Sequence, residues 1–154
     1  MDIKIYSREA IETLLCEGFP DNVAVISFYN PPTGLGIDKD YRPVDYSGKS
    51  DCAFQIALHD IDIEILDEYG LTYETYLSEA DELAEFIYTA KRDGVDIICQ
   101  CEYGQSRSTA CAAAIREHFT GDGIQIFADY RYYPNQLVYN KVIGALEKYK
   151  ESQS

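Results

Sequence analysis

Short runs of apolar residues alternate with segments in which apolar residues recur every three or four positions. This order predicts alternating strands and helices. The first run, residues 3–6, predicts a strand, and Ser7 after it is typical of a helix N-cap. The helix is expected to run to Cys16 and to end at Gly18. Residues 22–28 then predict a second strand, so the chain begins as strand, helix, strand.

A long connection interrupts the alternation before it resumes. Residues 29–50 contain three prolines and three glycines and predict a long loop, a feature that often has a function in a compact domain. Within it Arg42 is either a solvated residue or one that faces a substrate. Residues 51–58 predict a third strand. Thr72 is typical of an N-cap, and the apolar residues after it recur at helical spacing up to Gly94, which predicts a helix.

The last third of the chain repeats the order of strand and helix. Residues 95–99 predict a buried strand, and residues 108–115 are small and predict a helix that packs closely against a sheet. Residues 135–149 show the apolar stripe of a final helix. Together these elements predict an α/β fold with a central, mostly parallel sheet flanked by helices on both faces. A site in such a fold is expected at the carboxyl ends of the strands.

Length, composition and charge limit the class of protein. The chain has 154 residues, of which 46% are hydrophobic, and we expect residues 1–154 to form a single domain. The first residues do not resemble a signal peptide, and no apolar stretch is long enough to span a membrane, which predicts a cytoplasmic protein. The net charge of −14 disfavours nucleic acids and anionic membranes as partners. The oligomeric state is left open.

The cysteines indicate a reducing compartment. Five cysteines without paired zinc-type spacing do not predict a disulfide framework, and the two histidines are too far apart in sequence to form a metal cluster by themselves. Cys16, Cys52, Cys99 and Cys111 are interpreted as small buried residues. For Cys99, two positions before Cys101, a redox role remains the alternative.

One segment, placed after the strand at residues 95–99 and before a helix, carries distinctive chemistry. It reads Cys101-Glu102-Tyr103-Gly104-Gln105-Ser106-Arg107-Ser108. Backbone N–H groups at a helix N-terminus stabilise both a thiolate and the oxygens of a phosphate. Arg107 can bind two phosphate oxygens, and Ser108 can donate a hydrogen bond to the sulfur of Cys101. Gly104 allows the loop to curl where a Cβ would clash. The segment therefore predicts a phosphate-binding loop with a nucleophile at its base.

This segment resembles the signature loop of the cysteine-dependent protein tyrosine phosphatases, written His-Cys-x2-Gly-x2-Arg-Ser/Thr. Since three predicted strands precede it, the chain resembles a small dual-specificity member of that superfamily. The resemblance implies that Cys101 is the nucleophile, that Arg107 and the loop from Glu102 to Ser106 bind the phosphate, and that Ser108 is the terminal hydroxyl. Gln100 stands where the family has histidine, which predicts a higher pKa for the Cys101 thiol than in relatives.

The resemblance also implies a general acid on a loop that follows an earlier strand. Asp60 is the first choice, because it is the first acid after the apolar run at residues 51–58. Asp62 is the second choice and Asp67 the third. Asp129 resembles the acid of the low-molecular-weight branch, in which the signature loop follows the first strand. It is set aside because the loop here follows three predicted strands.

These residues predict hydrolysis of a phosphoric monoester through a cysteinyl-phosphate, without a metal or another cofactor. The variable loop positions Glu102, Tyr103 and Gln105 carry no lysine or arginine, whereas relatives that act on inositol lipids usually have basic residues there. The substrate is therefore expected to be phosphotyrosine in a protein, with dual specificity as an extension, or a small phosphomonoester.

Two other functions stay open. The chain could be a pseudophosphatase that binds phosphate without catalysis, or an arsenate reductase or sulfur-transfer enzyme with a related loop. The cluster at Tyr130, Tyr132 and Tyr133 is interpreted either as an aromatic wall for a phosphotyrosine ring or as packing at the edge of the sheet.

Overall fold

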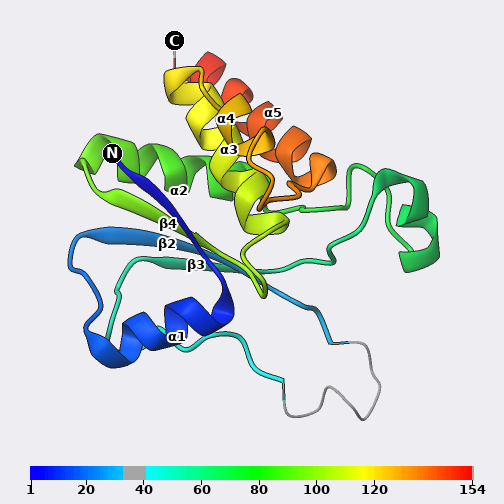
Figure 1. Ribbon diagram of the computed structural model, residues 1–154. Helices are drawn as coiled ribbons and strands as arrows, with labels where there is room; N and C mark the ends of the chain where they lie inside the picture. Colours follow the sequence, from blue (N-terminus) through cyan, green and yellow to red (C-terminus); the bar gives the residue numbers. More distant parts are fainter. Residues whose placement is uncertain (33–40, 154) are drawn as a thin grey trace.

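The computed structural model describes residues 1–32 and 41–153, and a four-stranded sheet lies at its centre (Figure 1). The strands are β1 (Ile3–Tyr6), β2 (Val23–Tyr29), β3 (Ala53–Ala57) and β4 (Asp96–Gln100). They lie in the order β1-β4-β2-β3, and every neighbouring pair is parallel. The predicted parallel sheet is confirmed. Of the long loop predicted at residues 29–50, positions 33–40 lie outside the described residues.

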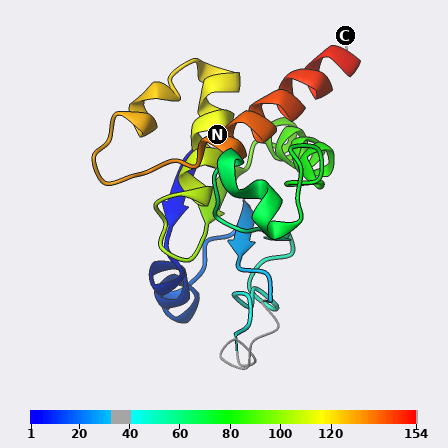
Figure 2. The ribbon, with the colours of Figure 1, turned by 90° about the vertical axis from the view of Figure 1, so that its right-hand side faces the viewer.

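Helices cover both faces of this sheet, as predicted. They are α1 (Arg8–Glu17), α2 (Ala80–Asp93), α3 (Arg107–Thr120), α4 (Ile124–Phe127) and α5 (Gln136–Ser152), with a 3-10 helix η2 (Ile63–Tyr69). Figures 1 and 2 show α1 and residues 41–50 below the sheet, and α2, α3, α4 and α5 above it. The 3-10 helix η2 lies beyond the carboxyl ends of the strands (Figure 1).

The two central strands are apolar because both of their faces are covered. In β2 the five residues from Ala24 to Phe28 are buried, and the register places Ala24 beside Ile97 of β4. On the lower face Ile11 of α1 packs with Val44 and other residues of a small second core. This packing anchors residues from the long loop against the sheet.

Helix α3 is buried along its first nine residues, from Arg107 to Ile115. Its small side chains, most of them alanine, allow it to lie between the sheet and α5 at close range. The helix predicted from these small residues is confirmed. Since α3 directly follows the Cys101 loop, this buried packing fixes the orientation of the loop.

The helix predicted to begin at Thr72 begins at Ala80 instead. Residues 73–79 form turns, and the Thr72 hydroxyl accepts a hydrogen bond from the backbone N–H of Thr75 at 3.3 Å. The backbone of Leu77 has φ 51°, a left-handed conformation that a helix cannot continue through. The Leu77 side chain is only 2% exposed, and its burial accounts for the unfavourable backbone.

Other features also differ from the sequence interpretation. The short helices η2 and α4 were not predicted. Cys16 and Cys52 are exposed, so the expectation that they are core residues is wrong. Cys16 lies in the last turn of the amphipathic α1, and Cys52 lies just before the edge strand β3. Cys99 and Cys111 are buried as expected. Among the described residues, no helix is both long and apolar enough to cross a membrane.

Candidate active site

Cys101 directly follows the last residue of β4, a central strand, and lies at the base of the loop that leads into α3. Its side chain is only 2% exposed. The sulfur lies 3.1 Å from the hydroxyl oxygen of Ser108, in the first turn of α3. The strand, the loop and the helix therefore bring the thiol and this hydroxyl into hydrogen-bond contact, as the sequence predicted.

Opposing effects act on the pKa of the Cys101 thiol. Burial raises it, because a thiolate loses hydration in the interior. Hydrogen bonds from the hydroxyl and the backbone N–H of Ser108 lower it, as do the charge of Arg107 and the backbone N–H of Ser106. The lowering effects prevail, and the pKa lies below its usual value. The loop thus favours the thiolate, which is the nucleophilic form.

Gly104 lies where the loop approaches the junction of β1 and α1. Its φ is +68°, and a Cβ at this position would lie 2.7 Å from the backbone nitrogen of Ser7 and 3.0 Å from the carbonyl carbon of Tyr6. Next to it, the backbone N–H of Arg8 donates to the carbonyl of Glu102 at 3.0 Å. Both the backbone conformation and the lack of space therefore require glycine here.

Arg107 is the first residue of α3 and its side chain is buried, with 3% exposure. One terminal nitrogen, Nη1, donates to the carbonyl of Leu58 at 2.7 Å. The Nε atom is buried and makes no hydrogen bond to any residue in the described part of the chain. A buried guanidinium N–H without an acceptor is costly, and an oxyanion in the adjacent loop would satisfy it.

Gln100 occupies the position of the family's histidine and is buried. Its amide oxygen accepts hydrogen bonds from Ser27 at 2.5 Å and from the hydroxyl of Tyr46 at 2.8 Å. Its amide nitrogen donates to the carbonyl of Cys101 at 3.0 Å. Burial raises the pKa of Tyr46, so its hydroxyl stays protonated and able to donate. A neutral network therefore fixes the backbone of the candidate nucleophile. The polar Ser27 within an otherwise apolar strand was the available sequence signal for it.

Asp60 lies on the loop after β3 and reaches the end of the Cys101 loop. Its Oδ1 atom accepts hydrogen bonds from the hydroxyl of Ser106 at 2.7 Å and from the amide of Asn135 at 2.8 Å. Of the candidate acids, Asp60 is therefore the one that the structure connects to the loop. The contact between Asn135 and Asp60 joins residues that are 75 positions apart, so it could not be predicted from local sequence patterns.

Three donors from distant segments fix the backbone of the loop that bears Asp60. The carbonyls of residues 58, 59 and 61 accept hydrogen bonds from Arg107 at 2.7 Å, Tyr76 at 2.6 Å and Asn135 at 3.0 Å respectively. Each donor is buried or nearly so. Arg107, which directly follows the Cys101 loop, thus also helps to fix the backbone of the loop that bears Asp60.

The other candidate acids have different surroundings. Asp62 precedes η2 and makes no capping hydrogen bond, and Asp67 lies within η2. Asp129 is paired with Arg131 at 2.7 Å, and hydrogen bonds from Arg131 lower the pKa of Asp129 to about 2. This ion pair stabilises the ionised carboxylate and disfavours the protonated form that a general acid needs. Setting Asp129 aside therefore agrees with its environment.

Exposed tyrosines border the Cys101 loop. Tyr103 on the loop is 78% exposed, and Tyr133, whose backbone N–H donates to Gln105 at 2.8 Å, is 71% exposed. Tyr132 instead packs against the core. Of the three tyrosines in the predicted cluster, Tyr130 and Tyr133 are thus exposed and Tyr132 packs against the core, and an aromatic wall for a phosphotyrosine ring stays a prediction.

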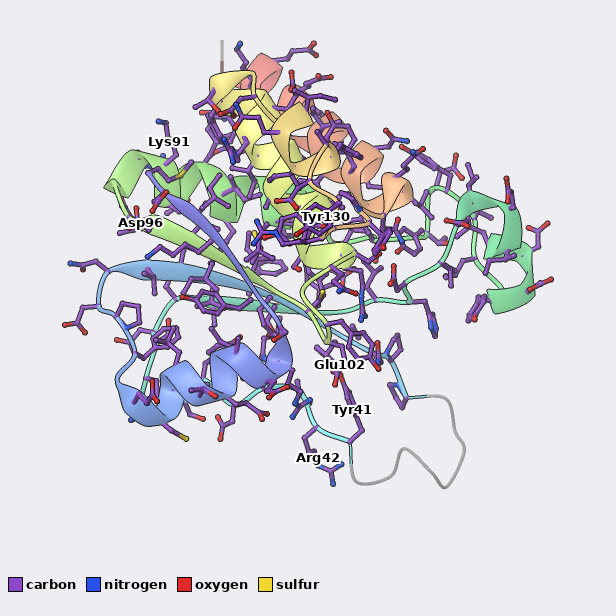
Figure 3. All side chains as sticks on the ribbon, viewed as in Figure 1. Tyr41, Arg42, Lys91, Asp96, Glu102 and Tyr130 are labelled. Atoms are coloured by element: carbon purple, nitrogen blue, oxygen red, sulfur yellow. The ribbon has the colours of Figure 1, made fainter. Side chains whose placement is uncertain are left out.

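On the opposite side of the loop, the hydroxyl of Tyr41 donates to a carboxylate oxygen of Glu102 at 3.2 Å. In Figure 3 Tyr41 lies between Arg42 and Glu102. Arg42 donates to the carbonyl of Tyr41 at 2.8 Å, and its own carbonyl accepts from Arg8 at 2.6 Å. Part of the long loop is therefore tied to the candidate site through its backbone and Tyr41.

Comparisons with known proteins find similarity in structure alone. No protein-family model matches the chain, and no curated protein matches it in sequence. Human DUSP28 is 15% identical with a TM-score of 0.59, over 99% of this chain and 95% of that chain. PTPMT1 is 12% identical with a TM-score of 0.55, over 99% and 96%. A human tyrosine phosphatase-like serine/threonine/tyrosine-interacting protein is 14% identical with a TM-score of 0.52, over 96% and 86%. The resemblance inferred from the sequence is thus confirmed in the architecture: the chain has the fold of the small, dual-specificity type of cysteine-dependent phosphatases.

Proposed function

We propose that this protein hydrolyses phosphoric monoesters through a cysteinyl-phosphate intermediate, with phosphotyrosine in proteins as the main substrate and phosphoserine or phosphothreonine as extensions. The observation that carries the proposal is the combination, at one site, of the Cys101 thiol and the buried Arg107 guanidinium. The thiol has a lowered pKa, and the buried guanidinium beside it keeps an Nε without an acceptor among the described residues. An incoming phosphate would supply both an electrophile for the sulfur and an acceptor for Nε.

In the first step, the Cys101 thiolate attacks phosphorus, and the bond between phosphorus and the ester oxygen breaks. The loop N–H groups and Arg107 hold the equatorial oxygens while negative charge develops on them. Asp60 gives its proton to the leaving oxygen, so that the product leaves as an alcohol or a phenol. The lowered pKa of Cys101 supports the role of the thiolate.

In the second step, water attacks the cysteinyl-phosphate and the sulfur leaves. Asp60, now ionised, takes a proton from the water, and inorganic phosphate is released. The hydroxyl of Ser108, 3.1 Å from the sulfur, donates a hydrogen bond that stabilises the departing thiolate. Because Cys101 must be reduced at the start of each cycle, we place the protein in a reducing compartment, the cytoplasm.

The hydrogen bonds of Asp60 support its two roles. Both Ser106 and Asn135 donate to the same oxygen, Oδ1. Because Oδ1 already accepts two hydrogen bonds, the proton of the acid is best carried on the other oxygen, Oδ2. The two hydrogen bonds keep the carboxyl group in one orientation while Oδ2 loses and regains this proton. This arrangement favours Asp60 over Asp62, whose side chain makes no capping hydrogen bond with the described residues of η2.

The two alternative functions have less support. One structural neighbour is named only as tyrosine phosphatase-like, and a fold by itself does not decide activity. However, a phosphate-binding module does not need an acid held beside the loop. A reductase would need a second reactive thiol. Cys99 is buried, and its hydrogen bond with Cys111 and its burial raise its pKa, which makes it a poor partner.

The Cys101→Ser variant tests the proposal. We expect the wild type to release phosphate from an aryl phosphate, and the variant to lose turnover while it still binds inorganic phosphate, because the loop and Arg107 remain. Steady-state hydrolysis and calorimetric titration with phosphate measure the two properties. Equal turnover in the variant would refute the covalent mechanism. Phosphate binding without turnover in the wild type would identify a pseudophosphatase, and thiol-coupled reduction of arsenate would identify a reductase.

A further inference from the structure

One groove runs from the end of the Cys101 loop along the loop that bears Asp60. We call it the acid-loop groove. It has a volume of about 550 Å³ and is lined by Asp60, Asp62, Glu64, Ser106 and Tyr133, together with the start of α5. Since Ser106 belongs to both the groove and the loop, a ligand held by the loop would extend directly into this groove.

A second groove lies on the other side of the same loop, against α1. We call it the α1 groove. It has a volume of about 780 Å³ and is lined by Glu9, Glu12 and Glu17 from α1 and by Glu102 and Tyr103 from the loop. The candidate phosphate site is thus bordered by grooves on two sides, and each contains part of the Cys101 loop.

Both grooves are negatively charged. Apart from Asp60, which carries a proton in the first step of the proposed reaction, the described lining of the acid-loop groove has two acidic residues, Asp62 and Glu64, and neither lysine nor arginine. The α1 groove has four carboxylates and one cation, Arg8, in its lining. Arg8 pairs with two of these carboxylates, Glu12 at 2.8 Å and Glu102 at 4.0 Å, and it donates to the carbonyl of Arg42 at 2.6 Å. Among the described residues that line the two grooves, carboxylates therefore outnumber lysine and arginine on both sides of the loop.

This charge distribution conflicts with a purely anionic substrate. A phosphate must enter between two acidic grooves, and the whole chain has a net charge of −14. Arg107, the first residue of α3 after the loop, is buried with 3% exposure. A substrate with positive charges on either side of its phosphate would be attracted by the grooves, whereas acidic neighbours would be repelled.

Each groove also presents an exposed aromatic ring. Tyr133 in the acid-loop groove is 71% exposed, and Tyr103 in the α1 groove is 78% exposed. A tyrosine face beside carboxylates suits a guanidinium or an ammonium, which bind both the ring and the anion. The carboxylates and the exposed tyrosine ring of each groove therefore both favour an arginine or lysine side chain.

We propose that the substrate is a phosphopeptide segment with arginine or lysine on both sides of the phosphorylated residue. The basic side chains on one side lie in the acid-loop groove, and those on the other side lie in the α1 groove. This proposal rests on the proposed function for the identity of the central group, but it concerns the charge of the substrate rather than the reaction.

Two phosphotyrosyl peptides with the same spacing test the proposal, one with arginine and the other with glutamine on both sides of the phosphotyrosine. At low ionic strength we expect kcat/KM to be about tenfold higher for the arginine peptide, since several partly exposed pairs form at once. Added NaCl should reduce this ratio, because salt screens exposed charges. Equal values, or a preference for a glutamate peptide, would overturn the proposal.

Variants of each groove show where the preference arises. Asp62→Asn with Glu64→Gln neutralises the acid-loop groove, and Glu9→Gln with Glu17→Gln neutralises the α1 groove. Each pair should lower the ratio between the arginine and glutamine peptides about threefold. The matched control is Glu82→Gln with Glu85→Gln, which removes the same charge from a separate groove beside the end of α5. If the control lowers the ratio equally, the preference for the arginine peptide comes from net charge, and the proposal that the two grooves cause it is refuted.

A binding measurement separates this proposal from the reaction. Fluorescence anisotropy with Cys101→Ser reports peptide affinity without turnover, so the preference for arginine remains measurable even if the wild type hydrolyses nothing. If the wild type hydrolyses nothing, the proposed function fails, but a preference of Cys101→Ser for the arginine peptide would still support the proposal about the charge of the ligand. A short-chain soluble phosphoinositide serves as a polyanionic competitor. We expect it to bind more weakly than the arginine peptide, and tighter binding would overturn the proposal.

Discussion

At the scale of single residues, the carboxyl of Asp60 offers the sharpest test of mechanism. Asp60→Asn keeps the shape of the side chain but removes its titratable proton. We expect hydrolysis of an aryl phosphate with a poor leaving group to slow about 100-fold, because that oxygen needs a proton as it departs. An activated aryl phosphate should be affected far less. Turnover measured over a series of leaving groups, and the loss of the alkaline limb of kcat, would report the change.

Asp62→Asn is the matched control for this experiment. Asp62 lies two residues further along the same loop and makes no capping hydrogen bond at the start of η2. Its variant should retain the wild-type dependence on the leaving group. If Asp62→Asn is impaired more than Asp60→Asn on poor leaving groups, the assignment of the acid is reversed.

Gln100 permits a test of pH dependence. The pKa of Cys101 is already lowered, and a neutral amide adds no charge to the site. In Gln100→His, an imidazolium beside Cys101 would favour the thiolate further. Because activity requires the thiolate, kcat/KM rises as pH rises through the thiol pKa, and a lower pKa shifts this limb to lower pH. The ultraviolet absorbance of the thiolate, measured without substrate, should shift in the same direction.

Gln100→Glu is the control of opposite charge. A carboxylate of nearly the same shape disfavours the thiolate, so the absorbance should then rise at higher pH than in the wild type. Identical titrations of the wild type and both variants would rule out an electrostatic influence of position 100 on the thiol.

At the scale of residues, the sequence could predict contacts between residues of one short segment. Cys101, Arg107 and Ser108 belong to one loop and one helical turn, so their spacing alone indicates that they meet. The contacts of Gln100 with Ser27 and Tyr46 join three segments that are far apart in the sequence. Only the packing of the sheet and the long loop brings them together, and local patterns contain no measure of that packing.

At the scale of elements, the N-terminus of α5 connects the acid loop to the core. Asn135 caps α5, since its side-chain oxygen accepts from the backbone N–H of Val138 at 3.0 Å. Its amide nitrogen donates to Asp60 and to the carbonyl of Ile61. One side chain thus begins a helix with its oxygen and positions the candidate acid with its nitrogen.

Asn135→Ser separates these two roles. Serine is as good an N-cap as asparagine but does not supply the amide donors, so the cost to helix stability should stay within about 1 kcal/mol. We expect kcat on poor leaving groups to fall about tenfold, as a misplaced acid transfers its proton less efficiently. Thermal unfolding and the leaving-group series measure the two effects. Unchanged kcat would show that the side-chain amide of Asn135 does not position the acid.

The bounds of elements with strong apolar periodicity were predicted with small errors, whereas the segment before α2 was wrongly predicted to be helical. The apolar spacing continued back to Tyr76, and it correctly marked Tyr76 and Leu77 as buried. However, turns can bury the same side chains as a helix does. The left-handed backbone of Leu77 is set by tertiary packing, so the true start at Ala80 could not be predicted from the pattern of apolar residues.

At the scale of the whole molecule, the parallel sheet explains why the site forms at all. The carboxyl ends of parallel strands meet at one edge, so β4 leads into Cys101 and β3 leads towards Asp60 at the same edge. The amino end of α1 follows β1 at this edge and approaches Gly104. The order of strands and helices could be predicted, and with it the edge that carries the chemistry.

The charge of the whole molecule leads to a prediction about stability. With a net charge of −14, the carboxylates of the folded chain repel one another, and salt screens this repulsion. We therefore expect Tm at neutral pH to rise by about 2–5 °C as NaCl is added, measured by thermal unfolding. Glu82→Gln with Glu85→Gln removes two exposed charges and should raise Tm at low salt while reducing the gain from NaCl. A Tm that falls with salt would mean that attractive ion pairs outweigh repulsion.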